Sequence, residues 1–111
     1  MKRTFIESSA FSRAIDAKSP GTLLQIQTEL LRNPGGGSVI QRTGGLRKMR
    51  VPDADRRKGK RGGYRVIYLD LPDAERTHLL AIYDKGEKDD ISTEEKRLLR
   101  AIAERIKREA R

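Results

Sequence analysis

The sequence predicts an α+β fold, in which a small, mainly antiparallel sheet is combined with two N-terminal helices and one C-terminal helix. Three observations lead to this prediction. Residues 63–84 hold two segments rich in β-branched and aromatic residues, separated by Pro72-Asp73-Ala74, which is the pattern of a β-hairpin. Residues 92–111 begin with the capping-box pair Ser92 and Glu95 and continue with apolar residues at helical spacing. The whole chain, residues 1–111, has the length of a single domain with one modest core.

The N-terminal third predicts one strand followed by two helices. Residues 3–7 form a short strand, and residues 8–19 place Phe11, Ala14 and Ile15 on one helical face. In the second helix Ser19 can act as the cap and Pro20 fits the first helical position, while Asn33-Pro34 ends the helix. The apolar stripe expected for this helix consists of Leu23, Leu24, Gln27, Leu30 and Leu31.

The remaining elements complete the order β-α-α-β-β-β-α. Residues 38–51 predict either a pair of strands or one bent strand, because Gly44-Gly45 interrupts them. We expect the helices on one face of the sheet, with the other face partly open and close to a basic loop. The buried stripe expected for the C-terminal helix consists of Leu98, Leu99, Ile102 and Ile106.

The positive charge of the chain is concentrated in one segment. The formal net charge is +9, and residues 42–65 hold ten basic side chains against two acidic ones. Such a cluster attracts a polyanion to one face of the molecule. A soluble basic loop without a partner is the alternative that the composition leaves open.

Several functional classes are disfavoured by the composition. The chain has no cysteine, which excludes disulfides and thiol chemistry and fits a reducing compartment. No signal peptide or membrane span is recognisable, so we expect a cytoplasmic protein without a membrane partner. The one histidine, His78, lies inside a strand and is expected to be structural. The acidic residues Asp84, Glu87, Asp89 and Asp90 precede a helix, where carboxylates serve as caps, so neither a metal nor a cofactor is expected.

Strand alternation points to a phosphate site beside the hairpin. Arg65 shares a strand face with Ile67 and Leu69, and Tyr83 shares one with Lys85. If both faces coincide, five basic residues converge at the rim of the sheet: Lys58, Lys60, Arg65, Lys85 and Lys88. Their repulsion opposes such an arrangement, and a bound phosphate would relieve it.

A site of lysine and arginine can cleave RNA without a metal. The 2′-hydroxyl of the substrate is the nucleophile, and the protein aligns it and stabilises charge on the phosphorus. Arginine matches phosphate oxygens bidentately but stays protonated. A lysine crowded by like charges has a lowered pKa and can serve as general base or acid.

The motifs "GGLRK", "GGYRVIY" and "IYDKGEKDDIS", in this order, resemble the RelE/HigB-type toxins of bacterial type II toxin–antitoxin modules. The resemblance extends from about Gly36 to Ile106. It implies a RelE-like toxin fold and a ribosome-dependent mRNA interferase that cuts mRNA in the ribosomal A site. It also implies a cognate antitoxin as partner, in this branch usually one with a helix-turn-helix DNA-binding domain.

The resemblance also implies roles for individual residues. Arg65 matches the strand arginine that contacts the scissile phosphate, Lys58 and Lys60 match catalytic loop residues, and Lys85 and Lys88 match basic residues after the last strand. Gly86 and the absence of a tyrosine from the C-terminal helix depart from the family pattern, which leaves the general base open. Contacts to RNA and the ribosome are expected from Arg47, Lys48, Arg50, Arg56, Arg57, Arg61 and Tyr83, although a strand tyrosine such as Tyr83 is more often part of the core.

Two other readings stay open. The first is a non-catalytic toxin of the same fold that inhibits a protein partner such as DNA gyrase. The second is a plain RNA-binding module. The clustered basic rim favours cleavage of RNA over both.

Overall fold

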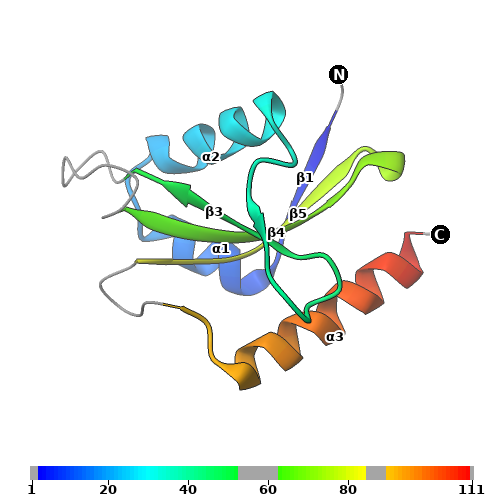
Figure 1. The fold of residues 1–111 in the computed structure, drawn as a ribbon. Helices are drawn as coiled ribbons and strands as arrows, with labels where there is room; N and C mark the ends of the chain where they lie inside the picture. Colours follow the sequence, from blue (N-terminus) through cyan, green and yellow to red (C-terminus); the bar gives the residue numbers. More distant parts are fainter. Residues whose placement is uncertain (1–2, 53–62, 85–89, 111) are drawn as a thin grey trace.

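A five-stranded mixed sheet is the centre of the computed structural model, which describes residues 3–52, 63–84 and 90–110 (Figure 1). The strand order is β1-β5-β4-β3-β2, with β1 parallel to β5 and the other neighbouring pairs antiparallel. The strands are β1 (Thr4–Glu7), β2 (Ser38–Val39), β3 (Arg47–Val51), β4 (Tyr64–Leu71) and β5 (Arg76–Asp84). The helices are α1 (Ser9–Asp16), α2 (Gly21–Arg32) and α3 (Thr93–Glu109). The predicted α+β class and the β4–β5 hairpin are confirmed.

The helices cover both faces of the sheet, so the expectation of helices on a single face is wrong. α1 and α2 lie on one side and α3 on the other (Figure 1). The central strand β4 explains this arrangement, because its apolar residues point both ways. Val66 and Tyr68 belong to the cluster under α1 and α2, whereas Ile67 and Leu69 belong to the cluster under α3. A strand that is apolar on both faces needs cover on both.

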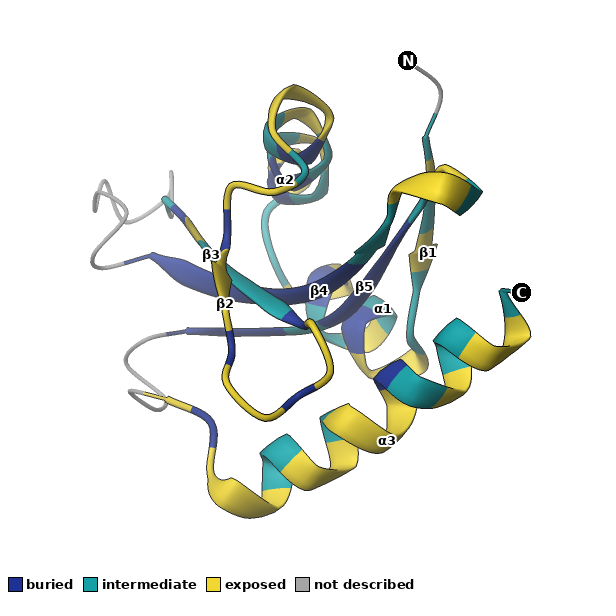
Figure 2. Ribbon diagram, turned by 45° about the vertical axis from the view of Figure 1, so that its right-hand side comes forward, coloured by how far each residue is buried: buried dark blue, intermediate teal, exposed yellow. Residues whose placement is uncertain are grey.

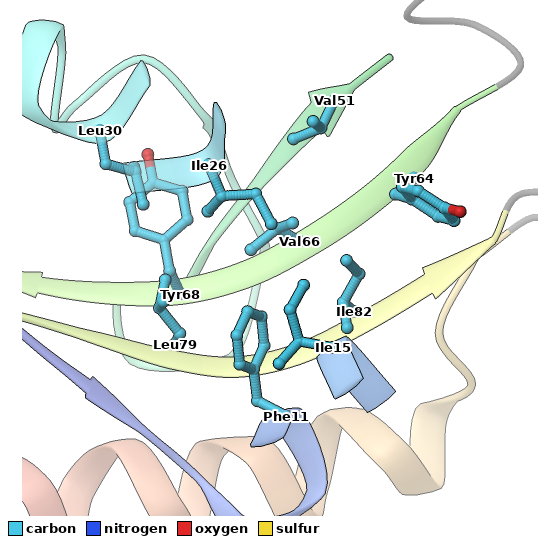
Figure 3. Packing of buried hydrophobic residues seen from close by; sticks show 10 residues of the cluster. All are labelled: Phe11, Ile15, Ile26, Leu30, Val51, Tyr64, Val66, Tyr68, Leu79 and Ile82. Carbon is cyan, nitrogen blue, oxygen red and sulfur yellow. The ribbon is translucent and has the colours of Figure 1, made fainter. Parts of the chain in front are cut away.

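The first core cluster lies between the sheet and the two N-terminal helices. Phe11 and Ile15 of α1 pack there as predicted, facing Val66 and Ile82 of the sheet (Figure 3). α2 contributes Ile26 and Leu30 (Figure 3). The predicted stripe of α2 is therefore partly wrong. Leu24 and Leu31 are exposed, and Ile26, absent from the prediction, is fully buried.

α2 also begins one residue later than predicted. Its N-cap is Pro20, which makes no side-chain capping bond. The cause of the misplaced stripe is that apolar residues occur around much of this helix, which leaves its buried side ambiguous in the sequence.

α3 packs on the opposite face through a narrower stripe than predicted. Ala103 is fully buried, and Leu99 and Ile106 are partly buried against the second cluster. Leu98 and Ile102, which were expected in this stripe, have exposed fractions of 64% and 43%. Figure 2 shows exposed residues along most of the helix. The capping box is confirmed: Ser92 Oγ accepts from Glu95 N, and Glu95 Oε1 accepts from Ser92 N.

Residues 38–51 form a pair of strands, which settles the alternative left open by the sequence. Between them, residues 40–46 make a loop that packs against α3, with Ile40 and Leu46 in the second cluster. Gly44 and Gly45 have φ values of 76° and 102°, a conformation that favours glycine. Lys107 Nζ of α3 donates a 2.5 Å hydrogen bond to Gly44 O.

A β-bulge in β5 changes which of its residues share a face. Ile67 pairs with Ala81 but Tyr68 pairs with Leu79, so Leu80 is the extra residue. Leu80 and Ala81 consequently both pack in the cluster under α3. Ser8 compensates for the irregular backbone, because its Oγ donates a 2.8 Å hydrogen bond to Leu80 O. The same Oγ accepts from Phe11 N and caps α1.

Candidate functional site

Arg65 lies on the central strand β4, on the face of the sheet that α3 covers. Its neighbours across the ladder are Arg50 of β3 and Tyr83 of β5. Only 4% of Arg65 is exposed, although Arg50 beside it is exposed. The Arg65 Nη1 atom donates to Tyr64 O at 3.4 Å. The structure therefore holds this guanidinium inside the protein. The strand pattern had instead suggested a position at the open rim of the sheet.

The bulge in β5 is what brings Tyr83 to Arg65. Without the extra residue, Tyr83 would share a face with Thr77 and Leu79, on the side of α1 and α2. With it, Tyr83 joins the cluster under α3 and faces Arg65 directly. Burial raises the pKa of the Tyr83 hydroxyl, Asp90 raises it further, and the positive charge of Arg65 lowers it. Tyr83 is buried, so its ring is part of the core rather than a surface on which a base could stack.

Lys48 and Asp90 form an ion pair on the same face. Lys48 lies opposite Ile67 in the ladder, and its Nζ is 3.1 Å from Asp90 Oδ1. Desolvation alone would raise the pKa of Asp90, but hydrogen bonds from Ile91 N and Lys48 hold it below the usual value. The pair connects β3 to the start of α3. The N-cap of α3 is Ser92, so Asp90 is not the helix cap that the sequence suggested for this acidic group; it bonds Ile91 N and Lys48 just before the helix.

Arg47 has a different setting from its two basic neighbours on β3. It lies opposite Tyr68, on the side of α1 and α2. Its Nη1 atom donates to Gly37 O at 2.8 Å and to Gly35 O at 3.2 Å. These bonds hold the segment between α2 and β2, so Arg47 faces away from Arg65. Of the expected RNA contacts in β3, Lys48 and Arg50 are the two that share the face of Arg65.

The other predicted site residues lie outside the described residues. They are Lys58, Lys60, Lys85, Lys88, Arg56, Arg57 and Arg61. The described strand ends still constrain where their segments are joined to the sheet. Val51 pairs with Tyr64, and Tyr64 pairs with Asp84. The last residue of β3, the first residue of β4 and the last residue of β5 therefore lie side by side, and this row of strand ends forms one edge of the sheet. Arg50 and Arg65 lie one residue inside that edge.

His78 is remote from this edge. It lies opposite Leu69, four positions along β4 from Arg65, which corresponds to about 13 Å. It is buried, and its Nε2 atom has no hydrogen-bond partner in the part of the chain that the structure describes. Burial, followed by the charge of Arg76, lowers the pKa of His78. A neutral imidazole in this position contributes to packing and cannot reach a substrate held at Arg65.

Within the described ranges, no group of three or more His, Cys, Asp or Glu side chains could hold a metal ion. No helix there has the length and hydropathy needed to cross a membrane. What the arrangement offers chemically is positive charge. Arg50 and Arg65 are direct partners on β3 and β4, with Lys48 on the same strand face. Charge of this kind binds phosphate and stabilises charge that develops on it.

The opposition of Arg50 and Arg65 was not predicted, because it depends on the register of two strands separated by residues 52–63. In a comparison with known families, the family described as the RelE toxin of the RelE/RelB toxin–antitoxin system matches residues 32–111. The matched region contains β2 to β5 and α3, and with them every residue of the candidate site.

Proposed function

Because the chain belongs to the RelE toxin family, we propose that it is a ribosome-dependent mRNA endonuclease that cleaves mRNA in the ribosomal A site and inhibits translation. Membership makes the chain the toxin of a toxin–antitoxin system, and toxins of this family generally cleave mRNA. The dependence on the ribosome and the cleavage chemistry are the proposed parts.

The observation that carries the proposal is the pair of arginines on neighbouring strands. Arg50 and Arg65 are direct partners in the β3–β4 ladder, where like charges destabilise a sheet. A phosphate bound between or beside them would offset this repulsion. Residues 53–62, which hold five basic and two acidic side chains, and residues 85–89, which hold two of each, are joined to the sheet at the same edge. That edge thus has the charge needed to hold an RNA backbone.

The proposed reaction is metal-independent attack by the 2′-hydroxyl on the adjacent phosphorus. Arg65 contacts the scissile phosphate and stabilises the negative charge of the transition state. Lys58, Lys60, Lys85 and Lys88 complete the site, and one of these lysines acts as general base or acid. Lys48, Arg50, Arg56, Arg57 and Arg61 contact RNA of the message or ribosome. Tyr83 supports Arg65 from the neighbouring strand.

In this proposal the toxin acts on ribosomes in the cytoplasm and is neutralised by a cognate antitoxin with a helix-turn-helix DNA-binding domain. The guanidinium of Arg65 has to become accessible when RNA binds. Contact with the ribosome would supply that change, which fits a toxin that requires the ribosome.

A second candidate is a non-catalytic toxin of the same fold that inhibits a protein such as DNA gyrase. One observation favours it: Arg65 is only 4% exposed, as a structural arginine would be.

Translation in a cell-free system, followed by mapping of mRNA ends, separates these functions. The endonuclease gives translation arrest together with new mRNA ends inside codons held in the A site, and it leaves free mRNA intact. A supercoiling assay with DNA gyrase is run in parallel. Arrest without new mRNA ends, or inhibition of supercoiling, would contradict the proposed function.

A further inference from the structure

A cavity of about 350 Å³ lies at the outer edge of β3, between that strand and the C-terminal end of α2. Its deepest residues are apolar: Leu30 and Tyr68 are buried in the first core cluster, and Met49 packs against that cluster (Figure 3). Its walls are polar and include Glu29 and Asn33. Sites for small ligands have this combination and a volume of roughly 300 to 1,000 Å³. These five residues have no part in the candidate site.

The cavity exists because β2 is short. β2 consists only of Ser38–Val39, and its pairing with β3 stops at Lys48. The preceding chain turns away from the sheet at the end of α2, where Gly36 N donates to Asn33 O at 3.0 Å. Among the described residues, no strand therefore pairs with β3 beyond Lys48 on its outer side. The cavity occupies the place that a longer β2 would fill.

Arg50 lines the cavity with its backbone, since its side chain shares the opposite face of the sheet with Arg65. Ile40 N donates to Leu46 O at 2.8 Å, so the polar backbone groups of Leu46 point to the outer side of the sheet. Every second residue along the strand points its backbone groups the same way, and Arg50 is one of them. Its N–H and C=O groups lie beyond the end of β2 and supply one donor and one acceptor to the cavity.

The charges around the cavity favour a neutral polar ligand over a phosphate group. Glu29 contributes a carboxylate, and the carbonyl groups at the end of α2 add partial negative charge. Arg32 Nη1 lies 3.8 Å from Glu29 Oε1, too far for a hydrogen bond, so the carboxylate keeps its capacity to accept. Arg47 lies on this face of the sheet, but its guanidinium bonds Gly35 O and Gly37 O. The cavity thus suits a flat ligand that offers N–H groups.

We propose that this α2–β3 cavity binds a guanine base of the message beside the phosphate held at the basic edge, which rests on the proposed function in taking the RNA to be mRNA. Single-stranded RNA is read through the Watson–Crick edges of its bases. Guanine is the RNA base with two adjacent N–H donors on that edge, and the Glu29 carboxylate can accept both. The Asn33 amide and the Arg50 N–H are donors for guanine O6, and Met49 and Tyr68 support the ring.

The cavity is within reach of a nucleotide bound at the basic edge. It lies where the next strand would be, and neighbouring strands are about 4.8 Å apart, so it is roughly 10 Å from β4. One nucleotide spans that distance between its phosphate and the far edge of its base. Arg50 borders both places, with its backbone at the cavity and its side chain on the face of Arg65.

An added peptide strand fits the cavity less well. Beyond Lys48, the outer side of β3 offers the backbone groups of Arg50, but the next residue that points outward is Pro52, which has no N–H. The turn at Gly36 closes the other end. A strand would therefore gain the hydrogen bonds of a single residue.

NMR titration of isotope-labelled toxin with GMP, AMP, CMP and UMP tests the cavity without any cleavage. GMP should bind about tenfold more tightly than the other three, the discrimination expected of a bidentate contact, and should shift the amide resonances of Arg50 and Gly37. Glu29→Gln should reduce GMP to the affinity of the others. Glu109→Gln is the matched control, because Glu109 also pairs with an arginine of its own helix but lies on α3. It should leave the affinity for GMP within about twofold, and circular dichroism checks that both variants are folded.

Mapping of mRNA ends on ribosomes tests whether the base comes from the message. The wild type should cut with a guanine at one fixed position beside the cleaved bond. Glu29→Gln should lose that preference while it still cuts, and Glu109→Gln should keep it.

Equal binding of the four nucleotides, or GMP binding that Glu29→Gln leaves unchanged, would overturn the guanine assignment. Loss of GMP binding in Glu29→Gln with unchanged cut sites would make a free guanine nucleotide the occupant and would overturn the proposal as well. The titration does not depend on cleavage, so failure of the cavity and failure of the endonuclease activity are distinguishable.

Discussion

At the scale of single residues, Arg65 combines a buried position with a charged neighbour on the next strand. A buried guanidinium is costly unless it is hydrogen-bonded or paired, and the structure gives it a backbone acceptor at Tyr64 O. Its position is determined by the strands on both sides rather than by a loop. A group held in this way is suited to act in the transition state more than in the initial binding of RNA.

Arg65→Ala should lower single-turnover mRNA cleavage on ribosomes by about a hundredfold or more, the usual effect of removing one preorganised charge donor. Ribosome affinity should change far less, because many other cations contribute to it. The control is Arg32→Ala, an exposed arginine of α2 that pairs only loosely with Glu29. It should cleave at the wild-type rate. A folded Arg65→Ala variant with normal cleavage would show that the active site lies elsewhere.

His78 predicts how stability depends on pH. Its folded-state pKa is lowered from 6.5, so the unfolded chain binds a proton more readily than the folded chain. Stability should therefore be constant well above pH 6.5 and fall as the pH decreases through 6.5 toward the folded pKa. The slope is at most about 1.4 kcal/mol per pH unit, since one proton is involved.

Urea unfolding at pH 7.5, 6.5 and 5.5 measures this dependence. His78→Gln should flatten the curve in this range, because the chain has only this one histidine. An unchanged slope in His78→Gln would assign the pH dependence to other groups.

At the scale of elements, one serine joins a helix start to a strand irregularity. Ser8 N donates to Leu79 O, and Ser8 Oγ bonds both Phe11 N and Leu80 O. The bulge shifts the register of β5 by one residue and so determines which side chains meet Arg65 and which pack under α3. The N-terminus of α1 therefore helps to hold the site together.

Ser8→Ala should lower the free energy of unfolding by about 2–3 kcal/mol, because it removes a helix cap and leaves the Leu80 carbonyl without that donor. Ser92→Ala is the comparison, since Ser92 Oγ caps α3 at an exposed position by accepting from Glu95 N. Its expected cost is about 1 kcal/mol. Equal losses in chemical denaturation would mean that the bond to Leu80 contributes little.

The connector between α2 and β2 depends on close contact with Tyr68. The Tyr68 hydroxyl donates to Pro34 O at 2.8 Å and accepts from Gly37 N at 2.9 Å. A Cβ atom at Gly37 would lie 2.8 Å from Tyr68 Oη and 2.9 Å from Lys48 O, so the backbone would have to move. At Gly35 a Cβ atom would meet nothing within 4 Å.

Gly37→Ala should therefore destabilise the protein by about 1–3 kcal/mol, the usual cost of overpacking. Gly35→Ala, two residues away, should change stability by less than about 0.5 kcal/mol. Thermal unfolding of both variants measures the difference. A Gly37→Ala variant as stable as Gly35→Ala would show that the connector adjusts without cost.

At the scale of the whole molecule, basic side chains and exposed apolar side chains occur together on the face of the sheet that α3 covers. The basic edge near Arg50 and Arg65 lies on the same side of the sheet as an apolar cavity that is lined in part by Leu98 and Ile102 of α3. The first suits a polyanion and the second a polypeptide.

Ribosome binding should weaken steeply with salt, because phosphate contacts release counterions. Affinity measured between 50 and 300 mM KCl should give a strongly negative slope of log K against log salt. A flat dependence for the ribosome would exclude the basic edge as the main contact.

Local patterns in the sequence were sufficient for the elements whose signals are local. The hairpin, the capping box at Ser92 and the α1 face of Phe11 and Ile15 all depend on residues within a few positions of each other. The family was also recognisable, because its motifs are short and their order is preserved. The buried side of α2 and of α3 was not predictable in full, because both helices carry more apolar residues than their packing uses.

What the sequence determined by itself is therefore the set of elements, the α+β class, the concentration of positive charge and the likeness to RelE toxins. The tertiary structure alone decided which residues meet. Helices cover both faces because β4 is apolar on both, Arg50 faces Arg65 because of the β3–β4 register, and Tyr83 joins them because of one bulge. These relations depend on contacts between segments far apart in the chain, and a shift of one residue in any strand would reverse them.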